Sequence, residues 1–212
     1  MHYNDIRCHI NCVVSVRCMK PIIISGKIGS GKSTVCKLFE KKSYKVINSD
    51  SIAKKLITQN PKIQKSLIEK FNGLILENNT LSLNKLRSLL CSSRENKEII
   101  DSIVHPVFYK ELNGLVSNST NHRTVIEIPL IETCSMLNME YILVFVKTDR
   151  EIREKRYLLR EHSDKNIFDK LDKYQINTSH SIKISDYIIN NNDNMDELVT
   201  NFNQLYKYLK NE

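Results

Sequence analysis

The sequence predicts an α/β fold in which a five-stranded parallel sheet is covered by helices. Five short apolar runs do not alternate with polar residues, which is typical of strands buried on both faces of a parallel sheet. Segments with helical spacing lie between these runs, as the right-handed crossovers of a parallel sheet require. The chain of 212 residues suits one domain with insertions better than two domains.

The elements follow one another in a regular order. The predicted strands are 21–25, 45–48, 124–128, 141–146 and 186–190. The predicted helices are 32–42, 50–58, 61–71, 84–90, 96–116, 149–160, 164–174 and 195–209. The first of these helices carries Val35, Leu38 and Phe39 at the spacing of one helix face. About 75 residues separate the second and third strands, which is too long for one crossover helix and predicts a helical insertion beside the sheet.

The composition is that of a soluble globular chain with an anionic partner. Hydrophobic residues make up 41% and charged residues 26%, which allows a buried core. The net charge of +8 fits nucleotide phosphates or nucleic acid. The chain has no apolar stretch of membrane length, no secretory apolar segment and no C-x-x-C pair among its 6 cysteines. We therefore expect a cytoplasmic protein with reduced thiols and no membrane partner.

Residues 26–33 read Gly-Lys-Ile-Gly-Ser-Gly-Lys-Ser and satisfy the phosphate-binding pattern G-x-x-x-x-G-K-[ST]. The pattern lies between a predicted strand and a predicted helix, which is the context that the motif requires. Its glycines allow successive backbone N–H groups to turn toward a phosphate. Lys32 can reach the β- and γ-phosphates, and the Ser33 hydroxyl can coordinate Mg²⁺. The sequence therefore predicts binding of ATP or GTP.

Guanine specificity is disfavoured, because neither Asn84-Lys85 nor Asn96-Lys97 has the Asp of an N-K-x-D motif. The size and the helical insertion suit a small-molecule kinase better than a motor or a helicase. Asp50 directly follows the second strand, at the sheet edge where the phosphate loop opens. A carboxylate there can accept the proton of an acceptor hydroxyl. Spacing alone equally allows Asp50 to cap the helix that follows.

Residues 25–54 resemble the opening of dephospho-CoA kinases, whose pattern is close to TGGIGSGKSTV followed by VIDADxIAR. Further matches occur in order at Leu81, Leu86, Val104-His105-Pro106, Ile128-Pro129-Leu130, Arg156, Arg160, Gln175 and 186–191. The resemblance covers residues 20–208 and is more specific than the phosphate loop alone.

The resemblance implies a three-layer P-loop kinase fold over residues 19–212. The core is expected at 20–58, 122–148 and 182–210, a helical acceptor-binding insertion at 59–121 and a helical lid at 149–180. Residues 1–18 are expected to be an extension outside the core. Their His2, Cys8, His9, Cys12 and Cys18 match no zinc-finger spacing.

The implied reaction is ATP-dependent phosphorylation of the ribose 3'-hydroxyl of dephospho-coenzyme A, the last step to coenzyme A. The resemblance implies the catalytic residues Asp50, Lys32 and Arg156. It implies that ATP is held by Gly29, Ser30, Gly31, Lys32, Ser33, Thr34, Arg160 and Asn191, with Mg²⁺ on Ser33. It implies that the acceptor contacts Asp50, His105 and Pro106. We expect a monomer or a weak homo-oligomer with no nucleic-acid partner.

Alternatives remain at several of these positions. His105 could be a helix-end residue before Pro106, and Arg156 with Arg160 could form a solvated surface pair. The acceptor could instead be a nucleoside or a nucleoside monophosphate. A nucleotide-gated nucleic-acid module is disfavoured, because the basic residues are scattered among acidic ones.

The chain also departs from the family pattern in ways that bear on acceptor affinity. Lys27 replaces the second glycine of the loop, which adds a cation there, and Asn48 replaces the first Asp of the D-A-D pattern. Leu83 replaces an arginine, for which Lys85 and Arg87 are the possible substitutes. An acidic residue comes one position early, as Glu132, and one extra residue precedes Arg156.

Overall fold

The computed structural model describes residues 20–119, 123–129, 134, 136–160, 164–175 and 178–211. Its centre is a parallel five-stranded sheet with the strand order β2-β5-β1-β6-β7. The strands are β1 (Ile22–Ser25), β2 (Lys45–Asn48), β5 (Thr124–Glu127), β6 (Ile142–Lys147) and β7 (Tyr187–Asn190). The predicted α/β class and all five predicted strands are confirmed. The predicted extension 1–18 lies outside the described residues.

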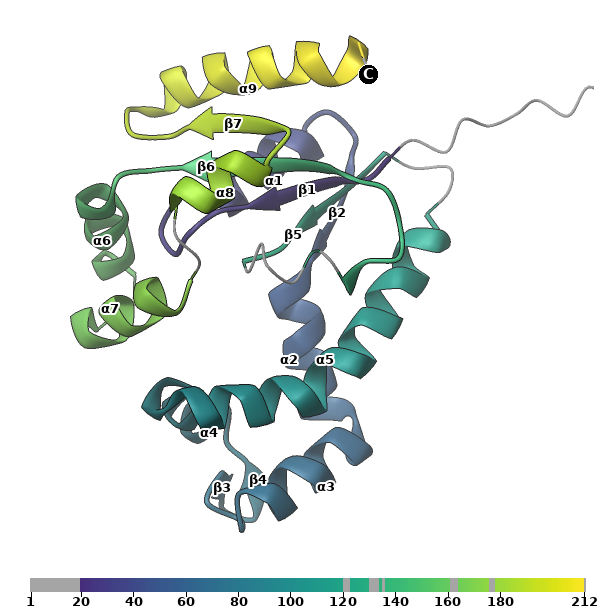
Figure 1. The fold of residues 1–212 in the computed structure, drawn as a ribbon, viewed down its shortest axis with the longest axis vertical. Coiled ribbons are helices and arrows are strands. Elements are labelled where there is room, and N and C mark those ends of the chain that lie inside the picture. The colour runs from purple at the N-terminus through teal and green to yellow at the C-terminus, as the bar shows by residue number, and fades with distance from the viewer. Residues whose placement is uncertain are drawn as a thin grey trace, which may run out of the picture.

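Helices cover both faces of the sheet (Figure 1). Helices α1 (Lys32–Glu40) and α9 (Met195–Asn211) pack on one face, where Phe39 and Phe202 meet Ile22 and Ile24 of β1. Ile23 points to the opposite face, because successive residues of a strand alternate between faces. The short, wholly apolar runs of the sequence are explained by this two-sided burial.

Helix α2 (Ser49–Gln59) follows β2 directly and leads into the predicted insertion, residues 59–121. The described part of that insertion contains three helices and one hairpin: α3 (Pro61–Lys70), β3 (Leu76–Glu77), β4 (Thr80–Leu81), α4 (Leu83–Ser92) and α5 (Arg94–Ser117). Asn60, Ser82 and Ser93 cap the helices that follow them with side-chain oxygens. The sequence prediction missed the hairpin, because its two-residue strands show no periodicity. Its turn carries Asn78 and Asn79 with φ of 49° and 61°, a conformation that asparagine tolerates.

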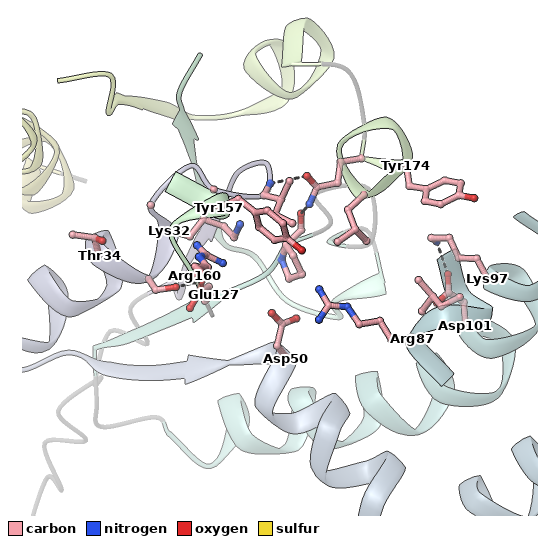
Figure 2. Close-up of a pocket in the computed structure, with 18 residues that line it drawn as sticks. Lys32, Thr34, Asp50, Arg87, Lys97, Asp101, Glu127, Tyr157, Arg160 and Tyr174 are labelled. Carbon is pink, nitrogen blue, oxygen red and sulfur yellow. Dashed lines mark hydrogen bonds and ion pairs between the residues drawn. The ribbon is translucent and has the colours of Figure 1, made fainter. Parts of the chain in front are cut away.

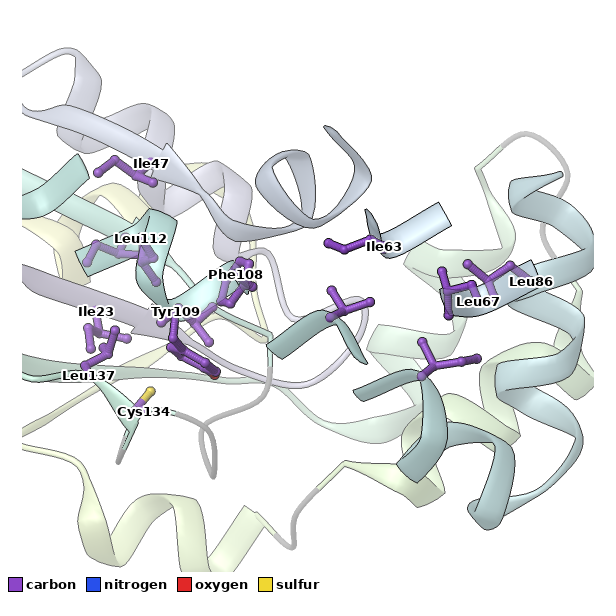
Figure 3. Packing of buried hydrophobic residues seen from close by; sticks show 14 of the residues in the cluster. Ile23, Ile47, Ile63, Leu67, Leu86, Phe108, Tyr109, Leu112, Cys134 and Leu137 are labelled. Atoms are coloured by element: carbon purple, nitrogen blue, oxygen red, sulfur yellow. The ribbon is translucent and has the colours of Figure 1, made fainter. Parts of the chain in front are cut away.

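The insertion shares the core of the sheet. One buried cluster joins Ile23 and Ile126 of the sheet to Phe108 and Leu112 of α5, and continues to Leu67 of α3 (Figure 3). The insertion therefore holds a fixed position relative to the strand ends.

Helix α5 carries Pro106 in its interior and bends near its middle (Figure 1). A proline inside a helix removes one backbone hydrogen bond and kinks the helix. His105 thus lies within a helix, and its interpretation as a helix-end residue is wrong.

The remaining helices follow β6. Helices α6 (Arg150–Leu158) and α7 (Lys165–Tyr174) lie beyond the carboxyl ends of the strands, and they match the two helices predicted for the lid (Figure 1). The short α8 (Thr178–Ile184) packs against β6 and was not predicted as a separate helix.

Across the described ranges, every helix is too short or too polar to cross a bilayer. Cys36 and Cys91 are buried thiols.

Candidate functional site

A cleft of about 480 Å³ opens at the carboxyl end of the sheet (Figure 2). The phosphate loop and the start of α1 form one wall, and residues of α4 and α5 form another. Tyr157 and Arg160 lie at the end of α6, and Leu171, Tyr174 and Gln175 line the cleft from α7. Asp50 and Glu127 stand at the floor, just after β2 and at the end of β5. The topology thus brings residues from distant parts of the chain to one sheet edge.

The phosphate loop has close neighbours at two glycines. Gly29 has φ of +78°, and a Cβ there would lie 2.4 Å from the carbonyl oxygen of Arg153. Gly31 has φ of +93°, and a Cβ there would lie 2.2 Å from the side-chain nitrogen of Asn191. Both the left-handed backbone and the close approach therefore require glycine at these positions.

Asn191 lies behind the loop rather than in the cleft. Its amide donates to the carbonyl oxygen of Ser30 at 2.8 Å, and the Thr148 hydroxyl donates to the same oxygen at 3.0 Å. Asn191 lines neither of the two cavities described here. Asn191, which was predicted to contact ATP, thus lies under the phosphate loop and hydrogen-bonds to it.

Lys32 closes the loop on itself. Its Nζ donates to the carbonyl oxygens of Gly26 at 2.8 Å and of Lys27 at 3.3 Å. Burial lowers the pKa of Lys32, and the nearby carboxylates of Glu127 and Asp50 oppose that effect. The ammonium group thus lies inside the loop, and Lys32 lines the cleft.

A hydrogen-bonded corner joins the loop to the floor of the cleft. Glu127 Oε1 accepts a hydrogen bond from the Ser33 hydroxyl, and Oε2 accepts one from the Asn48 amide, both at 2.8 Å. Neighbouring hydroxyl and carboxylate oxygens are the ligands that Mg²⁺ prefers. Asn48 thus contributes a neutral donor where the family pattern has a carboxylate.

Asp50 lies in the first turn of α2, and Asn48 is the N-cap, with its side chain accepting from the Ser51 N–H at 2.8 Å. The interpretation of Asp50 as the cap is therefore wrong. Its exposed side chain faces the cleft and points toward Arg87 (Figure 2). The walls of the cleft displace bulk water and raise the pKa of Asp50; Lys32 counteracts this, while Glu127 adds to it.

The two predicted lid arginines have different surroundings. Arg160 lines the cleft, and its guanidinium lies 5.9 Å from the centre of the Tyr157 ring. Arg156 donates to the carbonyl oxygens of Asn191 at 2.8 Å and Asp193 at 3.3 Å, and it lines neither cavity. The two do not form a solvated surface pair, because one is bonded to the β7–α9 loop and the other faces the cleft.

A second cavity of about 220 Å³ adjoins the cleft and is lined mainly by apolar side chains of α2 and α5. Asp50 and Asp101 line both cavities, and His105 lines the second. Asp101 Oδ1 lies 3.4 Å from His105 Nε2, and Asp101 Oδ2 accepts from Lys97 at 2.6 Å. Burial lowers the pKa of His105, although Asp101 opposes the effect. Pro106 is exposed and lines neither cavity.

Of the two possible substitutes for the missing arginine, Arg87 is the one that lines the cleft. Lys85 instead donates to the carbonyl oxygen of Leu76 at 2.6 Å. Glu132 lies outside the described residues.

Sequence reasoning missed Glu127, Lys97 and Asp101. Glu127 could have been found, because it ends a predicted strand at the same sheet edge as Asp50. Lys97, Asp101 and His105 follow one another at four-residue spacing, which places them on one helix face.

Known proteins resemble this chain over most of its length. A family model described as dephospho-CoA kinase matches residues 21–197. The dephospho-CoA kinase of Fusobacterium nucleatum is 30% identical over 179 residues, which cover 82% of this chain and 91% of that protein. That of the gamma-proteobacterium EBAC31A08 is 28% identical over 190 residues, covering 88% and 96%.

Two solved structures share the fold. Dephospho-CoA kinase from Campylobacter jejuni superposes with a TM-score of 0.60 at 19% identity, covering 91% of this chain and 98% of its own. TT1252 from Thermus thermophilus gives a TM-score of 0.74 at 23% identity, covering 90% and 98%. The family match spans most of the chain, from before the phosphate loop to the start of α9, so the chain belongs to the dephospho-CoA kinase family.

Proposed function

We propose that this protein transfers the γ-phosphate of ATP to the ribose 3'-hydroxyl of dephospho-coenzyme A, giving coenzyme A and ADP. The observation that carries the proposal is the position of Asp50. Its side chain lines both the cleft that holds the phosphate loop and the adjoining apolar cavity of the insertion. An acceptor in the second cavity can therefore present a hydroxyl beside a carboxylate and in front of the loop.

The residues at the loop fit MgATP. The left-handed glycines, the N-terminus of α1 and Lys32 form a cradle of N–H groups and positive charge for phosphates. Ser33 and Glu127 would hold Mg²⁺, which supplies positive charge between the phosphates when it is bound. We assign ATP contacts to Gly29, Ser30, Gly31, Lys32, Ser33, Thr34 and Arg160.

The walls beside Asp50 fit an acceptor that carries phosphate groups and a long apolar arm. Arg87 and Lys97 place two cations in the wider cleft. Val104, Phe108 and other apolar residues line the narrower cavity. We propose that His105 contacts the acceptor there, and that Pro106 acts only by shaping α5.

The proposed chemistry follows from these positions. Asp50 orients the acceptor hydroxyl and takes its proton as the oxygen attacks phosphorus. Lys32 and Arg160 neutralise the charge that develops on the transferred group. Arg156, expected to be catalytic, is proposed instead to support the loop through the carbonyl of Asn191. The monomeric or weakly oligomeric state, the cytoplasmic location and the absence of a nucleic-acid partner stay predictions from the sequence.

Product analysis tests the proposal. The purified protein with ATP, Mg²⁺ and dephospho-coenzyme A is expected to yield coenzyme A, detected by mass spectrometry, with one ADP per product. Adenosine and AMP serve as competing acceptors in a parallel panel. Faster phosphorylation of either would contradict the proposed acceptor and favour a nucleoside or nucleotide kinase.

The pH dependence of the reaction is a second expectation. Asp50 must be ionised to accept a proton, and its surroundings raise its pKa. Activity is therefore lost as the pH falls through this raised pKa, at a higher pH than for an ordinary aspartate. The measurement is kcat/KM for the acceptor against pH, at saturating ATP and magnesium. If kcat/KM falls to half only at or below the ordinary pKa range of aspartate, the burial of Asp50 does not set the pH dependence of the reaction.

A further inference from the structure

Lys27, the cation that replaces a glycine of the family pattern, points toward the lid. Its Nζ donates to the backbone carbonyl of Asp172 at 3.1 Å and lies 3.2 Å from the Asp172 carboxylate. The two side chains are only 15% and 13% exposed. A link between the phosphate loop and α7, 145 residues apart, is thus largely shielded from water.

The same carboxylate also binds the buried Arg153 of α6. Arg153 Nη1 donates to Asp172 at 2.6 Å and to the carbonyl oxygen of Ile28 at 3.3 Å. Arg153 Nε donates to the carbonyl oxygen of Thr148 at 3.0 Å. Burial alone would raise the pKa of Asp172, but the hydrogen bonds and charges of Arg153 and Lys27 bring it below its usual range. The carboxylate therefore stays ionised at neutral pH beside Lys27 and Arg153, and Arg150 Nε lies 3.6 Å from its other oxygen.

Helix α7 meets the loop again at its C-terminal end. The Ile28 N–H donates to Gln175 Oε1 at 2.7 Å. Gln175 lines the cleft together with Leu171 and Tyr174 of α7. The position of α7 at Lys27 thus sets both the conformation of the loop at Ile28 and one wall of the cleft.

We propose that Lys27 is a positioning residue that fixes α7 against the phosphate loop and so preorganises the loop for ATP. The cation that Lys27 adds at the loop is paired with Asp172. The Lys27 carbonyl accepts hydrogen bonds from the Ser30 N–H at 3.1 Å and from Lys32. The contact of Lys27 with Asp172 of α7 therefore restricts the motion of the peptide groups in the phosphate loop.

The test rests on the proposed ATP binding and measures it directly. Lys27→Met keeps much of the side-chain length and removes the charge, and Lys27→Arg restores it. We expect Lys27→Met to weaken calorimetric binding of a non-hydrolysable ATP analogue with Mg²⁺ about tenfold, from the loss of one charge-assisted contact. We expect KM for ATP to rise by a similar factor, kcat to stay within about twofold, and Lys27→Arg to recover most of the loss.

Two further variants complete the test. Lys165→Met removes a lid cation that pairs with Glu154 and does not touch the loop, so its ATP affinity is expected to match the unmodified protein. In an Asp172→Asn background, Lys27→Met is expected to weaken ATP binding less than it does in the unmodified protein, because the carboxylate partner is gone and only the contact with the backbone carbonyl of residue 172 remains.

Unchanged analogue binding in Lys27→Met would overturn the proposal. So would a fall in kcat and in melting temperature with no change in KM, because that pattern indicates a structural role alone. Failure of the unmodified protein to bind the analogue would count against the proposed function instead.

Discussion

Asp50→Asn is expected to lower kcat about a thousandfold, which is within the range for loss of a general base. Asparagine has nearly the same shape as aspartate but cannot take up the proton of the attacking hydroxyl. Binding of the ATP analogue is expected to change by less than about twofold, because Asp50 is directed at the acceptor side of the cleft. Single-turnover rates with dephospho-coenzyme A and calorimetric titrations of the analogue measure the two effects separately.

The fold is expected to tolerate this substitution. Asn48, and not Asp50, caps α2, so the helix keeps its N-terminal hydrogen bond. A carboxyl group whose pKa is raised by folding destabilises the folded state at pH values where it is ionised. The melting temperature of Asp50→Asn at neutral pH is therefore expected to equal or exceed that of the unmodified protein. Active-site carboxylates often have this cost to stability.

The exposed Asp196 in the first turn of α9 provides a matched control. Asp196→Asn makes the same chemical change away from the cleft and is expected to keep full activity. Near-normal turnover in Asp50→Asn would remove Asp50 from the reaction. Loss of analogue binding in this variant would show that Asp50 acts on the nucleotide rather than on the acceptor.

Features encoded by neighbouring residues could be predicted from the sequence. The five strands appear as short apolar runs because both faces of the sheet are covered. The phosphate loop can be identified because its glycines, Lys32 and Ser33 occupy consecutive positions. Asp50 follows its strand directly, so its place at the sheet edge needs only the rule that parallel strands end together.

Features that depend on strand order or on distant partners could not be predicted from the residues alone. Glu127 meets Asn48 because β5 lies directly between β2 and β1, an order that no local pattern contains. The sequence shows that Lys27 adds a cation at the loop, but it does not show that α7 brings Asp172 to that cation. The contact of Asn191 with the Ser30 carbonyl, and that of Arg156 with the Asn191 carbonyl, likewise join residues that are far apart in the sequence.

Glu127→Gln is expected to raise the Mg²⁺ concentration needed for half-maximal rate at least about tenfold, and to lower kcat about a hundredfold. The substitution keeps the size of the side chain and one oxygen acceptor but removes the negative charge. The Asn48 side chain is neutral, so it cannot replace the lost charge in this corner. Initial rates over a range of Mg²⁺ concentrations, at fixed total ATP, measure the effect.

The expected loss follows from electrostatics rather than from unfolding. Both hydrogen-bond donors to Glu127, the Ser33 hydroxyl and the Asn48 amide, are uncharged. The buried Lys32 loses the nearby charge of Glu127 but keeps the carboxylate of Asp50. Glu140→Gln is the control, because Glu140 is exposed and pairs with Lys20 at the opposite end of the sheet. An unchanged Mg²⁺ midpoint in Glu127→Gln would mean that the carboxylate only anchors Ser33. A higher Mg²⁺ midpoint in Glu127→Gln, with no change in Glu140→Gln, would place the metal between the phosphate loop and β5. Glu127 supplies the negative charge there, because its neighbour Asn48 is neutral.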